Sequence, residues 1–272
     1  MPGTAVHIAR RPRGFVRVTG ADAASYLERM LSNEVETLDV GASCEALLLT
    51  AKARVIAPMT VWRRGVEDFL LLTEPELAET LQRELVRSRF AAKAAIEVEE
   101  HASVLVLGKE APPGAVANRD YGLPAYELVD EEPPEWGELE EGELERLRIL
   151  ARSPSFGREL DDRVLPAEAG LDERAVSFTK GCYPGQEPVA RLHYRGHPNR
   201  TLRVLAFEGD APDADAEVTR DGKAVGRVTS SARDPEHGNV ALAYVRREVP
   251  PGAELAVGSR TARQLDLVAP RP

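Results

Sequence analysis

Hydrophobic and polar positions along the first half of the chain predict a mixture of strands and helices. Apolar side chains at helical spacing predict helices over residues 21–32 and 77–86, and Pro75 stands where the first residue of a helix is tolerated. The polar segment around Gly65 predicts the turn of a hairpin. Alternating or short apolar stretches predict strands at residues 15–19, 55–62, 69–73, 96–98 and 104–107.

The pattern changes at residues 130–145, which hold nine acidic residues and no lysine or arginine. We expect a solvated connection or the charged start of a helix, because an apolar helical stripe begins at Leu144 and continues to Leu150. The tail after Arg200 shows no helical pattern, so a small separate β-barrel or sandwich is expected there. Its short strand-like stretches lie at residues 202–207, 224–229, 240–245 and 263–268, with turns at Asp221-Gly222 and Pro251-Gly252.

Length and composition favour a soluble protein with more than one module. The chain has 272 residues, of which 43% are hydrophobic and 29% charged. No stretch has the roughly 18 apolar residues of a spanning helix, and the first 20 residues lack the apolar centre of a signal peptide. We therefore expect a cytoplasmic protein without a membrane partner. A net charge of −10 disfavours nucleic acid as a general partner.

One segment indicates chemistry rather than packing: Lys180-Gly181-Cys182-Tyr183-Pro184-Gly185-Gln186-Glu187. Two glycines and a proline predict a tight loop with exposed backbone, and such loops often carry function. Lysine supplies only 5 of the 35 cations, and a cation beside Cys182 would favour the reactive thiolate. From spacing alone, a small buried cysteine at a turn is the alternative. Cys44, in an apolar run, is expected to lie in the core.

Cations and an aromatic side chain follow this loop. Arg191, Tyr194 and Arg195 come soon after it, and Glu187 is the only acid between residues 180 and 203. Arginine recognises carboxylates and phosphates, and tyrosine offers a face to a flat ring, so a small anion with an aromatic head would suit this region. The alternative is that these arginines pair with the acidic residues of 130–145.

Two further sites would use overlapping residues. Cys182, His193 and His197 are possible metal ligands, but Gly196 and Pro198 interrupt the helix that would align the two histidines, and a fourth ligand is missing. No metal site is therefore predicted. A Cys182–His193 nucleophile pair would make the protein a thiol enzyme, although no pattern supplies the other groups such an enzyme needs.

The loop resembles the mark of the YgfZ family of folate-binding proteins, K-G-C-[FY]-x-G-Q-E, at every specified position. Flanking segments agree, among them residues 165–168 and 189–191. Residues 18–23 and 226–230 are similar to the corresponding parts of the wider aminomethyltransferase superfamily, which includes the T-protein of glycine cleavage. The likeness thus covers nearly the whole chain.

This resemblance implies an α+β fold with an N-terminal folate-binding module at residues 1–199 and a C-terminal β-barrel at residues 200–272. The module would consist of two interleaved subdomains, residues 1–50 with 142–199 and residues 51–141. Tetrahydrofolate or a derivative is the implied ligand, and iron–sulfur client or assembly proteins are the implied partners. The implied catalytic residues are Cys182 and Lys180, and the implied folate-binding residues are Tyr183, Gln186, Glu187, Arg191, Tyr194 and Arg195.

Two departures separate the chain from the glycine-cleavage enzyme. Pro58 stands where that enzyme has an aspartate, and Leu123 stands where it has a pterin-binding glutamate. Since proline cannot exchange a proton, aminomethyl transfer is disfavoured. A folate-binding accessory protein is the first hypothesis, a one-carbon transferase the second, and a thiol or metal enzyme unrelated to folate the third. Pro188 is expected to bar a helix from running through the end of the motif.

Overall fold

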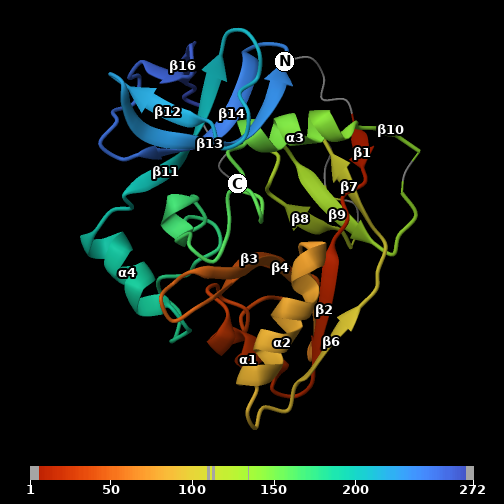
Figure 1. The fold of residues 1–272 in the computed structure, drawn as a ribbon. Helices are drawn as coiled ribbons and strands as arrows, with labels where there is room; N and C mark the ends of the chain where they lie inside the picture. The colour runs from red at the N-terminus through yellow and green to blue at the C-terminus, as the bar shows by residue number, and fades with distance from the viewer. Residues whose placement is uncertain (1–5, 109–110, 112–113, 134, 268–272) are drawn as a thin grey trace.

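The structure is a computed structural model that describes residues 6–108, 111, 114–133 and 135–267. Its strands form two five-stranded sheets and a closed six-stranded barrel. In Figure 1 the barrel lies at the top, above the two sheets, and α4 stands at the left edge of the molecule.

The first sheet is antiparallel, with strand order β3-β4-β5-β2-β6. Helices α1 (Ala23–Met30) and α2 (Ala78–Ser88) pack on one face, because their buried leucines meet alternate strand residues such as Val16 and Phe69 in one core cluster. A 3-10 turn with Pro75 at its first position leads into α2. The strands are β2 (Gly14–Thr19), β3 (Ser43–Leu49), β4 (Val55–Gly65), β5 (Asp68–Thr73) and β6 (Ala95–Glu99).

The second sheet has the order β10-β1-β7-β9-β8 and is covered by α3 (Glu141–Leu150), whose Leu144 and Leu147 pack against Leu105. The two sheets meet where Leu72 of β5 packs against Val116 of β8. The second sheet's strands are β1 (His7–Ala9), β7 (Ser103–Leu107), β8 (Val116–Asn118), β9 (Ala125–Val129) and β10 (Gly137–Glu138).

The barrel has the order β11-β14-β13-β12-β15-β16 and closes by pairing of β11 with β16. Successive residues of β11 are buried on opposite faces: Leu205 lies in the barrel interior, and Val204 packs with the loops between α3 and α4. Those loops end at α4 (Gln186–Arg195). The barrel strands are β11 (Arg200–Phe207), β12 (Glu217–Arg220), β13 (Lys223–Asp234), β14 (Gly238–Arg246), β15 (Leu255–Val257) and β16 (Arg260–Gln264).

These elements confirm the α+β fold and the C-terminal barrel. The last predicted strand is wrong in its bounds, because β16 ends at Gln264, and residue 268 lies outside the described residues. The expectation for Pro188 is also wrong: α4 includes it in its first turn, where the backbone N–H groups have no intrahelical partner to lose. The expected subdomain boundary at residue 50 lies in the turn between β3 and β4. These two strands pair with each other, and both belong to the first sheet, whose five strands all lie within residues 14–99.

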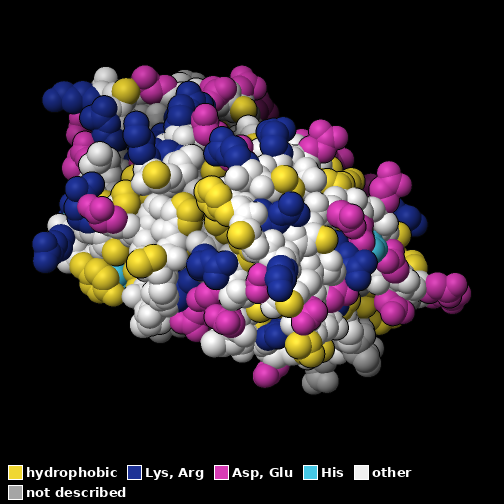
Figure 2. Space-filling model, turned by 90° about the horizontal axis from the view of Figure 1, so that it is seen from below, with side chains coloured by type: hydrophobic (Ala, Val, Ile, Leu, Met, Phe, Trp, Pro, Cys, Tyr) yellow, Lys and Arg dark blue, Asp and Glu magenta, His cyan; other side chains and the backbone are white. Residues whose placement is uncertain are grey.

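The surface seen in Figure 2 mixes cationic and acidic side chains, and no extended positive face for a phosphate backbone lies on this side. Within the described residues, no helix is both long and apolar enough to cross a lipid bilayer.

A buried polar junction ties the barrel to the rest of the fold. The Glu159 carboxylate accepts hydrogen bonds from Arg148 Nη1 of α3 at 2.9 Å and from Ser230 Oγ of β13 at 2.7 Å. Its backbone carbonyl accepts a bond from the Tyr244 hydroxyl of β14 at 2.8 Å. The Glu159 side chain has no exposed surface and the Arg148 side chain is 9% exposed, so the two form a buried ion pair.

We therefore predict that Arg148→Ala lowers the free energy of unfolding by about 3–5 kcal/mol, since it leaves a buried carboxylate without its cation. Arg158→Ala is the matched control: Arg158 also pairs with an α3 carboxylate, that of Glu145, but is 55% exposed, and it should cost less than about 1 kcal/mol. Urea unfolding of both variants checks this, and equal losses would contradict the role of the junction.

Candidate functional site

The motif loop, residues 180–187, rests against the turn between β3 and β4. Gly185 has a φ of +85°, and a Cβ placed there would lie 2.6 Å from the backbone oxygen of Thr50. Only glycine fits this close approach without moving the turn. The loop therefore has a fixed position on the first sheet, and α4 begins within its last two residues, at Gln186.

Lys180 anchors this loop. Its Nζ donates hydrogen bonds to the backbone oxygens of Leu31 at 2.9 Å and Asn33 at 2.6 Å, and lies 3.3 Å from Glu28 Oε1. The side chain is 1% exposed, and this burial lowers the pKa of Lys180. Among the described residues these partners occupy the ammonium group, so the geometry gives Lys180 a structural task whatever its effect on the thiol.

Cys182 and Tyr183 point to different environments. Cys182 is exposed, so the alternative of a buried cysteine at a turn is wrong. Tyr183 is buried, and burial raises its pKa to about 12. Its hydroxyl has no hydrogen-bond partner among the described residues. Cys44 is half-buried, packs against the core cluster of the first sheet, and donates to the backbone oxygen of Glu34 at 3.4 Å.

The remaining predicted binding residues lie on or near α4. Gln186 Nε2 lies 3.4 Å from the backbone oxygens of Lys180 and Gly181, which closes the loop on itself. Glu187, Arg191, Tyr194 and Arg195 are exposed. The imidazole of His193 stacks on Phe178 with ring centroids 3.8 Å apart, and the Tyr194 ring meets His193 edge-on.

Neither Arg191 nor Arg195 forms an ion pair in the part of the chain that the structure describes. Arg200 pairs with Glu168 at 3.2 Å instead of with the acidic segment. The alternative that arginines after the motif pair with residues 130–145 is therefore wrong within the described residues.

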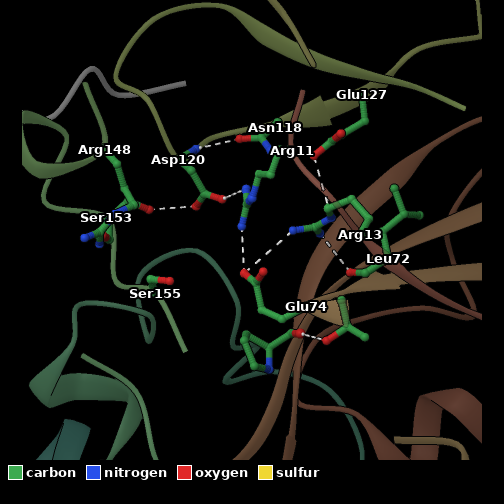
Figure 3. A network of polar contacts seen from close by, with 12 residues as sticks. Arg11, Arg13, Leu72, Glu74, Asn118, Asp120, Glu127, Arg148, Ser153 and Ser155 are labelled. Atoms are coloured by element: carbon green, nitrogen blue, oxygen red, sulfur yellow. Dashed lines mark hydrogen bonds and ion pairs between the residues drawn. The ribbon is translucent and has the colours of Figure 1, made fainter. Parts of the chain in front are cut away.

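A second group of charged side chains lies where the segment before β2, the end of β5 and the segment after β8 meet (Figure 3). Glu45 of β3 and Arg174 join this group through further ion pairs. Arg11 bridges two acids, with Nη2 at 2.7 Å from Glu74 and Nη1 at 2.9 Å from Asp120. Arg174 also bridges two acids, with Nη2 at 2.9 Å from Asp120 and Nη1 at 3.3 Å from Glu45. We call Arg11, Arg13, Glu45, Glu74, Asp120, Glu127 and Arg174 the central charge cluster.

Asp120 is the hub of this cluster. It accepts hydrogen bonds from both arginines and from Ser153 Oγ, at 2.6 Å. Burial opposes ionisation of Asp120, but the guanidinium groups of Arg174 and Arg11 outweigh it and hold its pKa well below the ordinary range. Burial has the opposite net result at Glu45, whose pKa is raised. Asp120 is thus fixed as an anion, whereas Glu45 binds a proton more readily than an exposed glutamate.

The cluster surrounds a small cavity of about 50 Å³ lined by Arg11, Arg13, Glu45, Pro58 and Glu74, among others. Two of these side chains have buried atoms without a hydrogen-bond partner among the described residues. One is Glu45 Oε2, an acceptor, and the other is Arg13 Nε, a donor that lies 3.7 Å from the Glu127 carboxylate (Figure 3). Buried polar atoms of native proteins almost always have partners. A carboxylate oxygen without a partner at a cavity that a guanidinium group also lines therefore indicates a binding site for a polar molecule.

A larger groove of about 620 Å³ adjoins the cavity, since Arg11 and Glu74 line both spaces. Its other walls come from β1, the start of α3 and the loop that holds Ser155 and Arg158. The Arg11–Glu74 ion pair therefore stands between the inner cavity and the groove.

Sequence reasoning missed the central charge cluster. Its members come from five separate segments of the chain. Each is an ordinary charged residue, and no local sequence pattern identifies it as part of a site. One signal was present: Glu45 is the single acid in the apolar run of residues 42–49, and a buried strand rarely carries an unpaired charge. Pro58, singled out for the missing aspartate, does line the cavity. Leu123 packs at the edge of the core under α3.

Comparison with known proteins agrees with this architecture. Residues 200–270 match the glycine cleavage T-protein C-terminal barrel domain. The chain is 27% identical over 200 residues to an uncharacterized protein of Haemophilus influenzae, which covers 71% of this chain and 70% of that protein. It is 22% identical over 267 residues to an aminomethyltransferase of Bacillus cytotoxicus, which covers 82% of this chain and 73% of the enzyme.

Among solved structures, the glycine cleavage system aminomethyltransferase T from Bartonella henselae matches with a TM-score of 0.85 at 18% identity. The match covers 98% of this chain and 88% of that one. The chain therefore has the fold of the glycine-cleavage aminomethyltransferase superfamily, with the six-stranded barrel at its C-terminal end.

The anchoring of the motif loop makes a prediction. Lys180→Met should lower the free energy of unfolding by about 2 kcal/mol or more, because two backbone oxygens and Glu28 lose a charged donor. Cys182→Ala, at an exposed position two residues away, should change it by less than about 0.5 kcal/mol. Guanidinium unfolding of both variants decides the matter. If the Lys180→Met protein is as stable as the parent, the anchoring role is contradicted, and an effect on the Cys182 thiol is the only role left for this lysine.

Proposed function

We propose that the protein binds a reduced folate, tetrahydrofolate or a derivative, with its pteridine ring at the central charge cluster. The observation that carries this proposal is the cavity lined by Glu45 and Arg13, where Glu45 Oε2 has no hydrogen-bond partner among the described residues. The pyrimidine edge of a reduced pteridine presents N–H donors beside a carbonyl acceptor. A carboxylate next to a guanidinium complements that edge, since the first accepts and the second donates.

The space around the cluster sets a condition on this binding. A cavity of about 50 Å³ holds one or two water molecules, whereas a pteridine ring is several times larger. The ring must therefore use part of the groove of about 620 Å³, and the Arg11–Glu74 ion pair that stands between them has to shift. A ligand that separates such a pair must supply hydrogen bonds of its own, as a pteridine and its carboxylate-bearing tail would.

The proposed biological role is that of an accessory factor for iron–sulfur proteins, in which Cys182 handles a thiol or persulfide of a client or assembly protein. The complete match to the K-G-C-[FY]-x-G-Q-E pattern supports this role. The exposure of Cys182 also supports it, because a thiol that serves another protein must be reachable. Lys180 would act on Cys182 through the position of the loop, which its buried bonds maintain.

Folate-dependent aminomethyl transfer is the second candidate function. The name of the Bacillus cytotoxicus relative and the superfamily fold favour it. Pro58 speaks against it, because this residue lines the cavity and β4 therefore presents no acid at the position where the glycine-cleavage enzyme has its aspartate. An assay for transfer of an aminomethyl group to tetrahydrofolate separates the two candidates, and turnover would favour the enzyme.

The binding proposal predicts micromolar or tighter affinity for tetrahydrofolate by isothermal titration calorimetry, with a loss of at least about tenfold in Arg13→Lys. Lysine keeps the positive charge but lacks the planar fork of N–H donors that the Arg13 guanidinium group brings to the cavity wall. Arg191→Ala serves as the comparison, because Arg191 was predicted to bind folate and lies exposed on α4. A loss confined to Arg191→Ala would place the ligand at α4 and contradict the central site.

The accessory role predicts that Cys182→Ala fails to restore iron–sulfur enzyme activity in cells that lack their own copy of the protein, while its melting temperature stays within about 2 °C of the parent. Cys44→Ala is the matched control, since Cys44 packs against the core and is not expected to reach a client. Full activity of the Cys182→Ala protein would remove the thiol from the mechanism.

A further inference from the structure

Glu45 and Pro58 belong to neighbouring strands that face the same cavity. In the antiparallel pairing of β3 with β4, Leu47 lies opposite Pro58 and Glu45 lies opposite Thr60. Residues directly opposite each other, and those two positions along a strand, project from the same face of a sheet. All four residues line the cavity. The carboxyl group of Glu45 therefore lies at the same cavity as Pro58, which has no acidic side chain.

The surroundings of Glu45 hold one of its oxygens and leave the other open. Oε1 lies 3.3 Å from Arg174 Nη1, and Oε2 has no partner among the described residues. The strand itself is held in place, because Asn33 Nδ2 donates to the backbone oxygen of Glu45 at 2.8 Å. The open carboxylate oxygen is therefore presented to the cavity by a fixed backbone.

Four charged groups face the Glu45 carboxyl group from the elements around it. Arg174, Arg119 and Arg13 favour its ionised form, whereas burial and the Asp120 carboxylate favour its neutral form. Asp120 stays ionised because it receives two guanidinium groups and the Ser153 hydroxyl. Of these two carboxyl groups, Glu45 is therefore the one whose pKa is raised and whose second oxygen has no partner among the described residues.

We propose that Glu45 is the acid of this cavity, supplied by β3 in place of the residue that Pro58 cannot provide, and that it gives up a proton when a reduced folate binds. The inference rests on the proposed folate binding and names its proton-exchanging group. Below its raised pKa, Glu45 holds a proton in the free protein. On binding, the proton leaves to solvent, and the carboxylate accepts N–H bonds from the pyrimidine edge. No other bond is made or broken.

The direction of the pH effect follows. Since the ligand binds the ionised form, affinity for tetrahydrofolate rises with pH and levels off above the pKa of Glu45, which lies above its ordinary value. Proton release is largest below that pKa and falls to zero above it. The stability that neutral Glu45 contributes is present below the ordinary pKa and is lost as pH rises through the raised one, so Glu45→Gln should not weaken the fold at neutral pH.

The test is calorimetry with tetrahydrofolate between about pH 4.5 and 7, in two buffers of different ionisation enthalpy, on the parent protein, Glu45→Gln and the exposed control Glu97→Gln. The parent and Glu97→Gln should release a fraction of a proton that falls with pH. Glu45→Gln should lose that release and bind at least about tenfold more weakly at neutral pH. Because the free ligand is the same in all three titrations, its own ionisation in solution cancels from the comparison, and the remaining difference comes from the loss of the Glu45 carboxyl group.

Each outcome has one meaning. If the parent protein does not bind tetrahydrofolate at any pH, the proposed function fails. If the parent binds without proton release, or if Glu45→Gln releases the same fraction as the parent, folate binding stands and the role of Glu45 is overturned. Should Glu45→Gln fail to fold, the proton release of the parent alone still decides, since its absence overturns the inference.

Discussion

The structure depends on the chain of half-buried ion pairs that runs from Glu45 through Arg174, Asp120 and Arg11 to Glu74. These five residues come from β3 and from four connecting segments, so the chain of ion pairs holds separate parts of the fold around one point. Charges withdrawn from water are costly to desolvate, and apolar side chains of similar size would often stabilise such a junction better. A cavity at which one Glu45 oxygen has no partner among the described residues gives a reason to keep these charges, namely a polar ligand.

The motif loop and the central cavity are two parts of one arrangement. Lys180 fixes the loop to the backbone of residues 31–33, and Asn33 in turn donates to the backbone of Glu45. A short path of hydrogen bonds therefore links the loop that carries Cys182 to the strand that carries Glu45. This path joins the two regions on which the proposed function rests, the cavity proposed for folate and the exposed thiol.

Much of the fold was predictable from the sequence, and the central site was not. Hydrophobic periodicity located the β4–β5 hairpin, α2 and the barrel, because burial of alternate residues fixes those elements locally. The motif located an exposed cysteine on a glycine-bounded loop. The central charge cluster was not predicted, because Arg13, Glu74 and Asp120 come together only through tertiary packing. The prediction for Pro188 was wrong because a proline in the first turn of a helix costs little free energy. The arginines of α4 also looked like ligand-binding residues, yet the fold turns Arg191 and Arg195 to its exterior.

The central claim is that a pteridine lies between Arg13 and Glu45, and a crystal structure of the protein with tetrahydrofolate bound tests it most directly. The account predicts ring density within hydrogen-bond distance of Arg13 Nε and Glu45 Oε2, with the Arg11–Glu74 ion pair displaced toward the groove. Ring density on α4, or in the groove beside the barrel strands with the Arg13–Glu45 cavity unchanged, would contradict it.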